Sequence, residues 1–252
     1  MKNNKSYILF LFVSFILTNG CKEDTSIDCN VFHWGYEEES GPEHWAGCFE
    51  DCDGQAQSPV DITGAIQDNT LVPLSVDYED APVNLINNGH TVEFEYESGS
   101  VLLFDGVQYE LLQFHFHAES EHSVSGQLYP LEVHLVHKNE ASGNLAVIGI
   151  LFETGDENTF LQQFINNLPD ETDEYFQVDT LVNVGELLPE DHSYYTYGGS
   201  LTTPPCSEIV TWVLLKTPVE ISNPQLQQFT SILHNNNRPI QQLHGRMIRE
   251  SM

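Results

Sequence analysis

Histidines at alternate positions in two short segments are the residues of this sequence best suited to chemistry. His115 and His117 are separated by one residue in the first segment, and His134 stands among apolar residues in the second. Both segments alternate in side-chain character, which is the period of a half-buried β-strand, so His115 and His117 share one face. If the two strands pair antiparallel, three imidazoles can converge on one cation. Three histidine ligands with an open fourth position are typical of a catalytic zinc site.

Two further polar residues lie on the faces that carry these histidines. Gln113 precedes His115 by two positions, and Glu132 precedes His134 by two. From there each side chain can accept the free ring N–H of the neighbouring histidine and so fix its tautomer, as supporting residues of metal sites do. His137 faces the opposite side from His134, and we expect it to be a core residue.

A different metal site competes for the same residues. The spacing His115-x-His117-x3-Glu121 resembles the first half of the cupin metal motif, whose members often bind iron. The second half of that motif does not match, because Lys138 stands where its asparagine belongs, and the bracketing glycines are misplaced. A cupin-like metal enzyme is therefore the alternative hypothesis.

The N-terminus has the pattern of an export signal. Residues 1–20 contain a basic start, an apolar run from Tyr7 to Leu17, and Gly20 before Cys21. The run is too short to span a bilayer, so we interpret residues 1–20 as a cleaved signal peptide. Cys21 resembles the lipidated first residue of bacterial lipoproteins, which predicts a lipid-anchored tether over residues 21–30 and a folded domain over residues 31–252. The expected location is the periplasm or cell surface, on the outer membrane of a Gram-negative bacterium.

The cysteine count is consistent with an exported lipoprotein. Five cysteines leave one unpaired, and lipidation of Cys21 accounts for it. Cys29, Cys48, Cys52 and Cys206 then remain for two possible disulfides in an oxidising compartment.

The net charge excludes two classes of partner. The sequence has 8 basic and 38 acidic residues, a net charge of −30, and removing Lys2 and Lys5 with the signal gives 6 − 38 = −32. Such a surface repels nucleic acid and anionic membranes. We therefore predict a small-molecule substrate, no nucleic-acid partner, and membrane attachment only through Cys21.

The elements that must position the histidines are mostly strands. Helical spacing is confined to residues 157–167 and 223–233, where Asn223 is the expected cap and Pro224 stands in the first turn. Residues 41–45, rich in aromatics, Gly and Pro, predict an irregular segment. The expected strands are 83–86, 92–96, 101–104, 113–117, 131–137, 145–152 and 208–216. Many strands with few helices predict one β-dominated domain.

Several motifs occur in an order that resembles one known family. They are Trp-Gly-Tyr at 34–36, Gly-Pro-Glu-His-Trp at 41–45, Gln-Ser-Pro-Val-Asp-Ile at 57–62, Asn-Asn-Gly-His at 87–90, the histidine strands, Ser-Leu-Thr-Thr-Pro-Pro at 200–205 and Asn-Arg-Pro at 237–239. From about His33 to the C-terminus the chain resembles the α-class carbonic anhydrases of bacteria. The resemblance implies a mostly β fold with a large, mainly antiparallel twisted sheet, a few short peripheral helices, and zinc in a conical cleft.

The resemblance also implies an activity and its residues. The activity is the hydration of carbon dioxide by a zinc-bound hydroxide, with Zn²⁺ held by His115, His117 and His134. Thr202 is expected to orient the hydroxide through Glu121, and His90 to carry the proton away. Gln113 and Glu132 match the residues that support the ligands. The expected substrate-binding residues are Val136, Val147, Leu201, Thr203, Val210 and Trp212.

Two further expectations follow from the same family. The position of Cys52 before the Gln-Ser-Pro segment matches relatives with a disulfide to the position of Cys206, which leaves Cys29 to pair with Cys48. Some family members have lost zinc ligands and act as binding modules. Here His115, His117 and His134 are all present, so we predict an enzyme rather than a non-catalytic binding module.

Overall fold

The structure is a computed structural model that describes residues 27–252. The predicted signal peptide at 1–20, the lipidation site Cys21 and most of the predicted tether lie outside the described residues. Within residues 27–252, no helix is long and apolar enough to cross a membrane.

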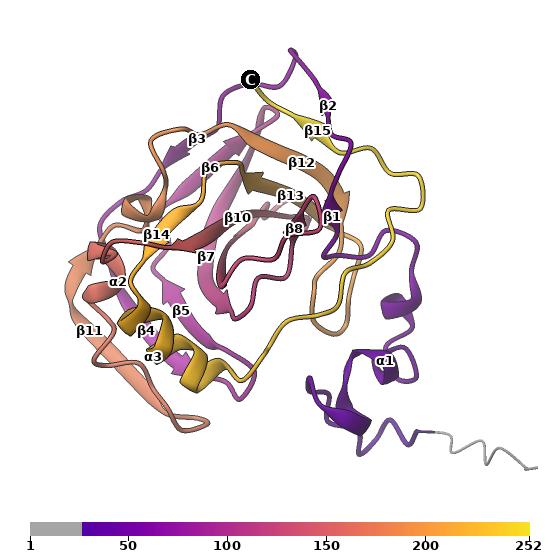
Figure 1. The fold of residues 1–252 in the computed structure, drawn as a ribbon, viewed down its shortest axis with the longest axis horizontal. Helices are drawn as coiled ribbons and strands as arrows, with labels where there is room; N and C mark the ends of the chain where they lie inside the picture. Colours follow the sequence, from indigo (N-terminus) through magenta and orange to yellow (C-terminus); the bar gives the residue numbers. More distant parts are fainter. Residues whose placement is uncertain (1–26) are drawn as a thin grey trace, which may run out of the picture.

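A large twisted sheet carries the metal-site residues (Figure 1). The hydrogen-bonded path through it runs β11-β4-β5-β7-β9-β10-β13-β12-β15-β2. The path strands are β2 (Ile66–Gln67), β4 (Ala81–Asn87), β5 (Val92–Tyr96), β7 (Val107–His117), β9 (Leu131–Lys138), β10 (Leu145–Thr154), β11 (Tyr175–Val182), β12 (Tyr194–Gly199), β13 (Val210–Leu215) and β15 (Arg249–Glu250). Off this path, β3 (Ser75–Asp77), β6 (Val101–Phe104) and β14 (Val219–Ile221) complete thirteen strands, and β1 (Asp61–Ile62) pairs separately with β8 (Ser123–Val124).

Most neighbouring strands of the sheet are antiparallel, as predicted. The exceptions in this sheet are β13 and β14, which both pair in parallel with β10, and β15, which pairs in parallel with β2. The residues of β10 from 146 to 152 are all buried, which explains the nearly continuous apolar sequence of this central strand.

The two faces of the sheet have different environments. On one face, Phe94, Phe114 and Phe116 belong to the main hydrophobic core, where the Phe94 and Phe114 rings stack with centroids 4.6 Å apart. The alternation in β7 therefore directs phenylalanines into this core and histidines to the other face. His137 is fully buried on the core side, which confirms its predicted role as a core residue.

The helices are short, and in Figure 1 α2 and α3 lie beside the sheet whereas α1 belongs to the N-terminal segment at the lower right. They are α1 (Pro42–Trp45), α2 (Thr159–Gln162) and α3 (Asn223–Leu233), with 3-10 helices η1 (Glu38–Ser40), η2 (Glu50–Asp53) and η3 (Val184–Leu187). The prediction for 223–233 is confirmed, except that Ser222 rather than Asn223 occupies the cap position.

Two predictions about local structure were wrong. Residues 41–45 are not irregular throughout, because Pro42 begins α1, a position where the missing N–H of proline costs nothing. The helix predicted over 157–167 is only the four residues of α2. Phe160, Leu161, Phe164 and Ile165 are all buried as their helical spacing predicts, but residues 163–166 form turns before Leu168-Pro169.

Candidate metal centre

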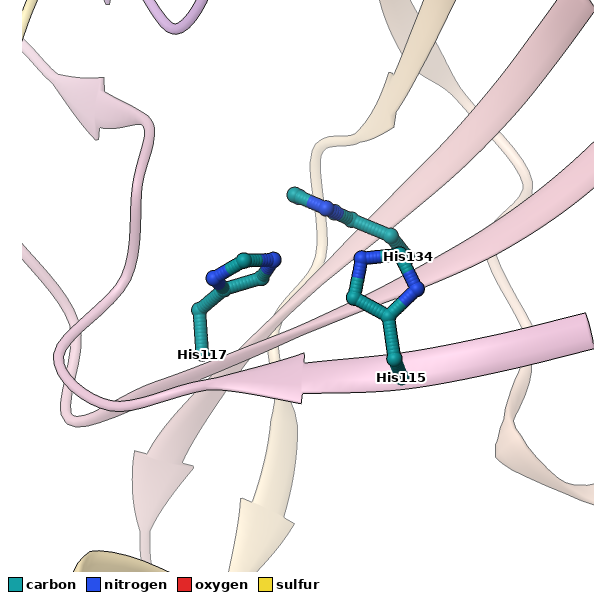
Figure 2. Close-up of side chains that lie close together, drawn as sticks. All are labelled: His115, His117 and His134. Atoms are coloured by element: carbon teal, nitrogen blue, oxygen red, sulfur yellow. The ribbon is translucent and has the colours of Figure 1, made fainter. Parts of the chain in front are cut away.

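Strands β7 and β9 bring the three predicted ligands together. They pair antiparallel, with His115 opposite His134 and His117 opposite Glu132. Directly opposed residues of an antiparallel pair extend their side chains from the same face of the sheet. Figure 2 shows the three imidazole rings turned toward one another, two from β7 and one from the neighbouring strand. One ring nitrogen of each histidine lies within 4.8 Å of the others, a spacing that can hold a metal ion.

Each imidazole uses one ring nitrogen to bond to the protein. His115 Nδ1 donates to Gln113 Oε1 at 2.8 Å, and His134 Nε2 donates to Glu132 Oε1 at 2.8 Å, both as predicted from the spacing. His117 Nδ1 donates to the backbone carbonyl of Asn236 at 2.7 Å. The second nitrogen of each ring is thereby left as an acceptor, which is the form that binds a metal.

Burial favours the neutral imidazoles that metal binding requires. It lowers the pKa of His115 well below its ordinary value, with a further contribution from neighbouring His117 and His134. Burial also lowers the pKa of His117, although the nearby Glu121 opposes the change. His117 Nε2 is buried and has no hydrogen-bond partner among the described residues. An unpaired nitrogen at this depth is costly unless a ligand completes it, so the residues present fit a bound cation.

Glu132 is the most connected acceptor of the site. Besides His134, its carboxylate accepts from the backbone N–H of Glu121 at 2.9 Å and of His122 at 2.8 Å, and from His122 Nδ1 at 2.7 Å. Burial opposes the charge on Glu132, but His122 and His134 together hold the pKa of its carboxyl well below its usual range. The carboxylate is therefore ionised, and it fixes His134 and the 121–122 turn at once.

His122 forms a second close group with Glu132 and His134, but this group is a hydrogen-bond network. Both ring nitrogens of His122 are engaged, Nδ1 with Glu132 and Nε2 with the Tyr197 hydroxyl at 2.6 Å. His134 also uses Nε2 toward Glu132. Every ring nitrogen of His122 and His134 that faces the Glu132 carboxylate is therefore already hydrogen-bonded to it.

Glu121 lies beside the free nitrogens of the ligands. Its Oε2 is 3.6 Å from His117 Nε2 and 3.9 Å from His134 Nδ1, while its Oε1 accepts the backbone N–H of Arg238 at 2.8 Å. Thr202 is buried, but no hydrogen bond joins it to Glu121 within residues 27–252, and Glu121 Oε2 has no hydrogen-bond partner there. Glu121 Oε2, the acceptor expected for the Thr202 hydroxyl, is thus free of other hydrogen bonds within the described residues.

Five of the six residues predicted to contact substrate form one apolar wall, and the sixth, Thr203, lines the cavity beside the ligands. Val147 is opposite Val136 on β9 and Trp212 on β13 across the sheet. The Trp212 ring centroid is 4.8 Å from that of His134, so the wall reaches the ligands. A single cluster contains Val147, Val210 and Trp212, with Val136 and Leu201 packed against it.

His90 lies at the rim of the same site. A cavity of about 110 Å³ is lined by His90, His115, His117 and Thr203, among others. The His90 ring stacks on Trp34 with centroids 3.6 Å apart and planes 9° apart. Burial lowers the pKa of His90, which favours its neutral form at neutral pH. We call the cavity lined by His90, His115, His117 and Thr203 the metal cavity.

Two disulfides are present in the structure. Cys52 joins Cys206 across 154 residues, and Cys29 joins Cys48 across 19 residues, so both predicted pairings are confirmed. Cys206 ends the loop that carries Thr202, and its backbone N–H donates to the Thr203 carbonyl at 2.9 Å.

Two residues near the ligands were not predicted from the sequence. Asn236 orients His117 with its carbonyl, and its side chain also accepts from the backbone N–H of Ala118 at 3.1 Å. Arg238 donates to Glu121 with its backbone N–H and to Gln57 with its guanidinium at 2.8 Å. The Asn-Arg-Pro motif at 237–239 identifies this segment in the sequence. It does not predict the contacts to His117 and Glu121, because backbone groups make them and these are the same in every residue type.

Comparison with known proteins gives consistent matches. The family model described as eukaryotic-type carbonic anhydrase matches residues 40–252. A carbonic anhydrase of Klebsiella pneumoniae is 43% identical over 225 residues, covering 86% of this chain and 91% of the relative. One from Pectobacterium carotovorum is 42% identical over 253 residues, covering 98% and 99%. The solved α-carbonic anhydrase of Thermovibrio ammonificans, in complex with the inhibitor sulfanilamide, has a TM-score of 0.84 at 41% identity, covering 86% of this chain and 98% of that one.

Proposed function

This chain belongs to the eukaryotic-type, or α-class, carbonic anhydrase family, and from that premise we propose that it catalyses the zinc-dependent, reversible hydration of carbon dioxide to bicarbonate and a proton. One observation carries the proposal. Three imidazoles on β7 and β9 each bond to the protein through one nitrogen, and ring nitrogens of all three lie within 4.8 Å of one another.

The donor set favours zinc over the alternative metals. Three imidazole nitrogens with an open fourth position match catalytic Zn²⁺, and Zn²⁺ bound there would supply a Lewis acid that makes water nucleophilic at neutral pH. The cupin-like alternative is disfavoured, because the carbonic anhydrase model matches residues 40–252 as a whole. A non-catalytic binding module is also disfavoured, since His115, His117 and His134 are all in place with their supporting acceptors.

The remaining residues take roles that their positions support. The wall of Val136, Val147 and Trp212 offers an apolar surface beside the ligands on which neutral CO2 can rest without competing water. Glu121 Oε2 has no hydrogen-bond partner in the described chain. It can accept the hydroxyl proton of Thr202, which would fix the orientation of that hydroxyl. Leu201 and Val210 extend the apolar wall, and Thr203 lines the metal cavity where the product forms.

The proton released by hydration needs a route to solvent. His90 lines the metal cavity and is partly exposed, and an imidazole titrates near neutral pH. We assign it the transfer of this proton to external buffer. Two disulfides within residues 27–252 favour an oxidising compartment, so we also propose that the protein is exported. Lipidation of Cys21 remains a separate prediction.

One experiment tests the central proposal. The purified mature protein is analysed for metal and assayed for CO2 hydration with and without a sulfonamide. His117→Ala should lose zinc and activity together, whereas His33→Ala, which changes an exposed histidine that does not line the metal cavity, should keep both. Iron as the bound metal, with no hydration activity, would overturn the proposal in favour of the cupin-like alternative.

A further inference from the structure

The metal cavity contains a carboxylate that neither the ligand set nor the apolar wall uses. Glu93 lines the cavity together with His115, His117 and Gln113. Of the residues lining this cavity in the described chain, Glu93 is the only carboxylate. A fixed negative charge at this place is unexpected for a site whose product is itself an anion.

The sheet explains why Glu93 reaches the cavity. Glu93 on β5 is directly opposite His115 on β7, so both side chains extend from the same face of the sheet. On the other side of β5, Val92 and Phe94 are buried in the core. The alternation that directs the ligands into the cavity therefore directs Glu93 there as well.

A hydrogen bond connects Glu93 to the ligand shell. Gln113 Nε2 donates to Glu93 Oε2 at 3.3 Å, while Gln113 Oε1 accepts from His115 Nδ1 at 2.8 Å. Burial, and then the charge of Glu95, raise the pKa of Glu93 above its ordinary value. Glu93 Oε2 accepts the N–H of Gln113, as the oxygen of an ionised carboxylate does.

We propose that Glu93 is a specificity-determining residue whose negative charge weakens the binding of anions in the metal cavity relative to neutral CO2. The inference rests on the proposed function, because it concerns ligands of the metal-loaded site. Like charges a few ångströms apart in a partly desolvated cavity repel more strongly than in bulk water. Bicarbonate and inorganic anions meet this repulsion, whereas carbon dioxide carries no charge.

Thiocyanate binding to the zinc-loaded protein tests the charge directly. Its dissociation constant is measured by titration calorimetry at pH 8 in the wild type, Glu93→Gln and Glu95→Gln. Glu93→Gln is isosteric and can keep its contact with Gln113, and we expect it to bind thiocyanate about 3–10-fold more tightly. Glu95 is exposed and lies two residues along the same strand outside the cavity, so Glu95→Gln removes the same charge and should change the affinity less than about twofold.

Kinetics provide a second readout. In Glu93→Gln the KM for bicarbonate should fall in proportion to the thiocyanate constant, and the KM for the uncharged CO2 should change less than the KM for bicarbonate. Glu93→Asp keeps the charge and should retain wild-type anion affinity. The inference is overturned if Glu93→Gln binds thiocyanate as the wild type does, if Glu95→Gln gives an equal gain, or if Glu93→Asp behaves like Glu93→Gln. A wild type that binds zinc but hydrates no CO2 would instead refute the proposed function, and thiocyanate titration would still decide the role of Glu93.

Discussion

The Asn236 carbonyl accepts a 2.7 Å hydrogen bond from His117 Nδ1, across 119 residues of sequence. The same asparagine donates through its side-chain amide to the Phe116 carbonyl at 2.9 Å and to the His90 carbonyl at 3.1 Å. Asn236, a single residue three positions after the end of α3, therefore fixes the metal ligand His117, the end of β7 and the loop that carries His90. Support of the three ligands thus comes from two side chains on their own strands and one backbone group from the C-terminal segment.

Glu132 should control zinc affinity although it does not face the metal. Glu132→Gln removes the charge that fixes His134 and places an amide N–H against donors that now lack an acceptor. We expect zinc affinity to fall about 10–100-fold, measured by competition with a chelator of known affinity. Glu153→Gln, an exposed glutamate on β10, is the control and should leave zinc affinity unchanged. Equal zinc affinity in Glu132→Gln and wild type would show that the charge on Glu132 is dispensable for zinc binding.

His90→Ala should separate proton transfer from the chemistry on carbon. Proton export follows hydration, so kcat in weak buffer should fall about tenfold or more while kcat/KM stays nearly constant. Added imidazole buffer should restore kcat, because an external base replaces the missing side chain. His33→Ala is the matched control, since this histidine is exposed and does not line the metal cavity. A parallel loss of kcat and kcat/KM, without rescue by imidazole, would remove His90 from this role.

The Cys52–Cys206 disulfide should stabilise the loop that holds Thr202. Replacing both cysteines by alanine releases a cross-link over 154 residues, which we expect to lower the free energy of unfolding by about 2–5 kcal/mol. Because Thr202 lies four residues before Cys206, activity should decline at denaturant concentrations where zinc is still bound. Paired urea titrations that follow activity and bound zinc test this order. The Cys29–Cys48 double variant is the comparison, and loss of zinc before activity in the Cys52–Cys206 variant would contradict the prediction.

The free energy of unfolding should decrease in mild acid because of His137. This histidine is fully buried, with Nε2 at 2.8 Å from the Tyr78 hydroxyl and Nδ1 at 3.2 Å from the Ala146 carbonyl. Burial lowers its pKa to about 4, against an ordinary value near 6.5. Between these values the unfolded chain binds the proton and the folded chain does not. The contribution of neutral His137 to the free energy of unfolding is therefore complete above about pH 6.5 and is lost as the pH falls toward 4.

His137→Gln isolates that contribution. The glutamine can keep a hydrogen bond to Tyr78 but does not titrate. Urea unfolding at pH 7 and pH 4 should show that the wild type loses about 2–3 kcal/mol more than the variant over this interval. The difference between the two proteins removes the shared contribution of the other histidines. Equal losses in both would mean that His137 can be protonated without unfolding.

The sequence alone was sufficient for those features that depend on local period. Alternation in 113–117 and 131–137 placed His115, His117 and His134 on one face with Gln113 and Glu132, and the antiparallel pairing of β7 and β9 confirmed it. This works because the side-chain direction in a strand repeats every two residues whatever the rest of the fold does. The same argument placed His137 in the core.

Other features required the tertiary structure. The Asn236 carbonyl at His117, the Arg238 backbone N–H at Glu121 and the cross-strand position of Glu93 beside His115 depend on which distant segments become neighbours. Backbone donors and acceptors are present at nearly every residue, so their partners leave no mark on side-chain type. The helix at 157–167 ended early for a related reason. Its apolar side chains were satisfied by packing against the core, and that burial did not require a continuous helix.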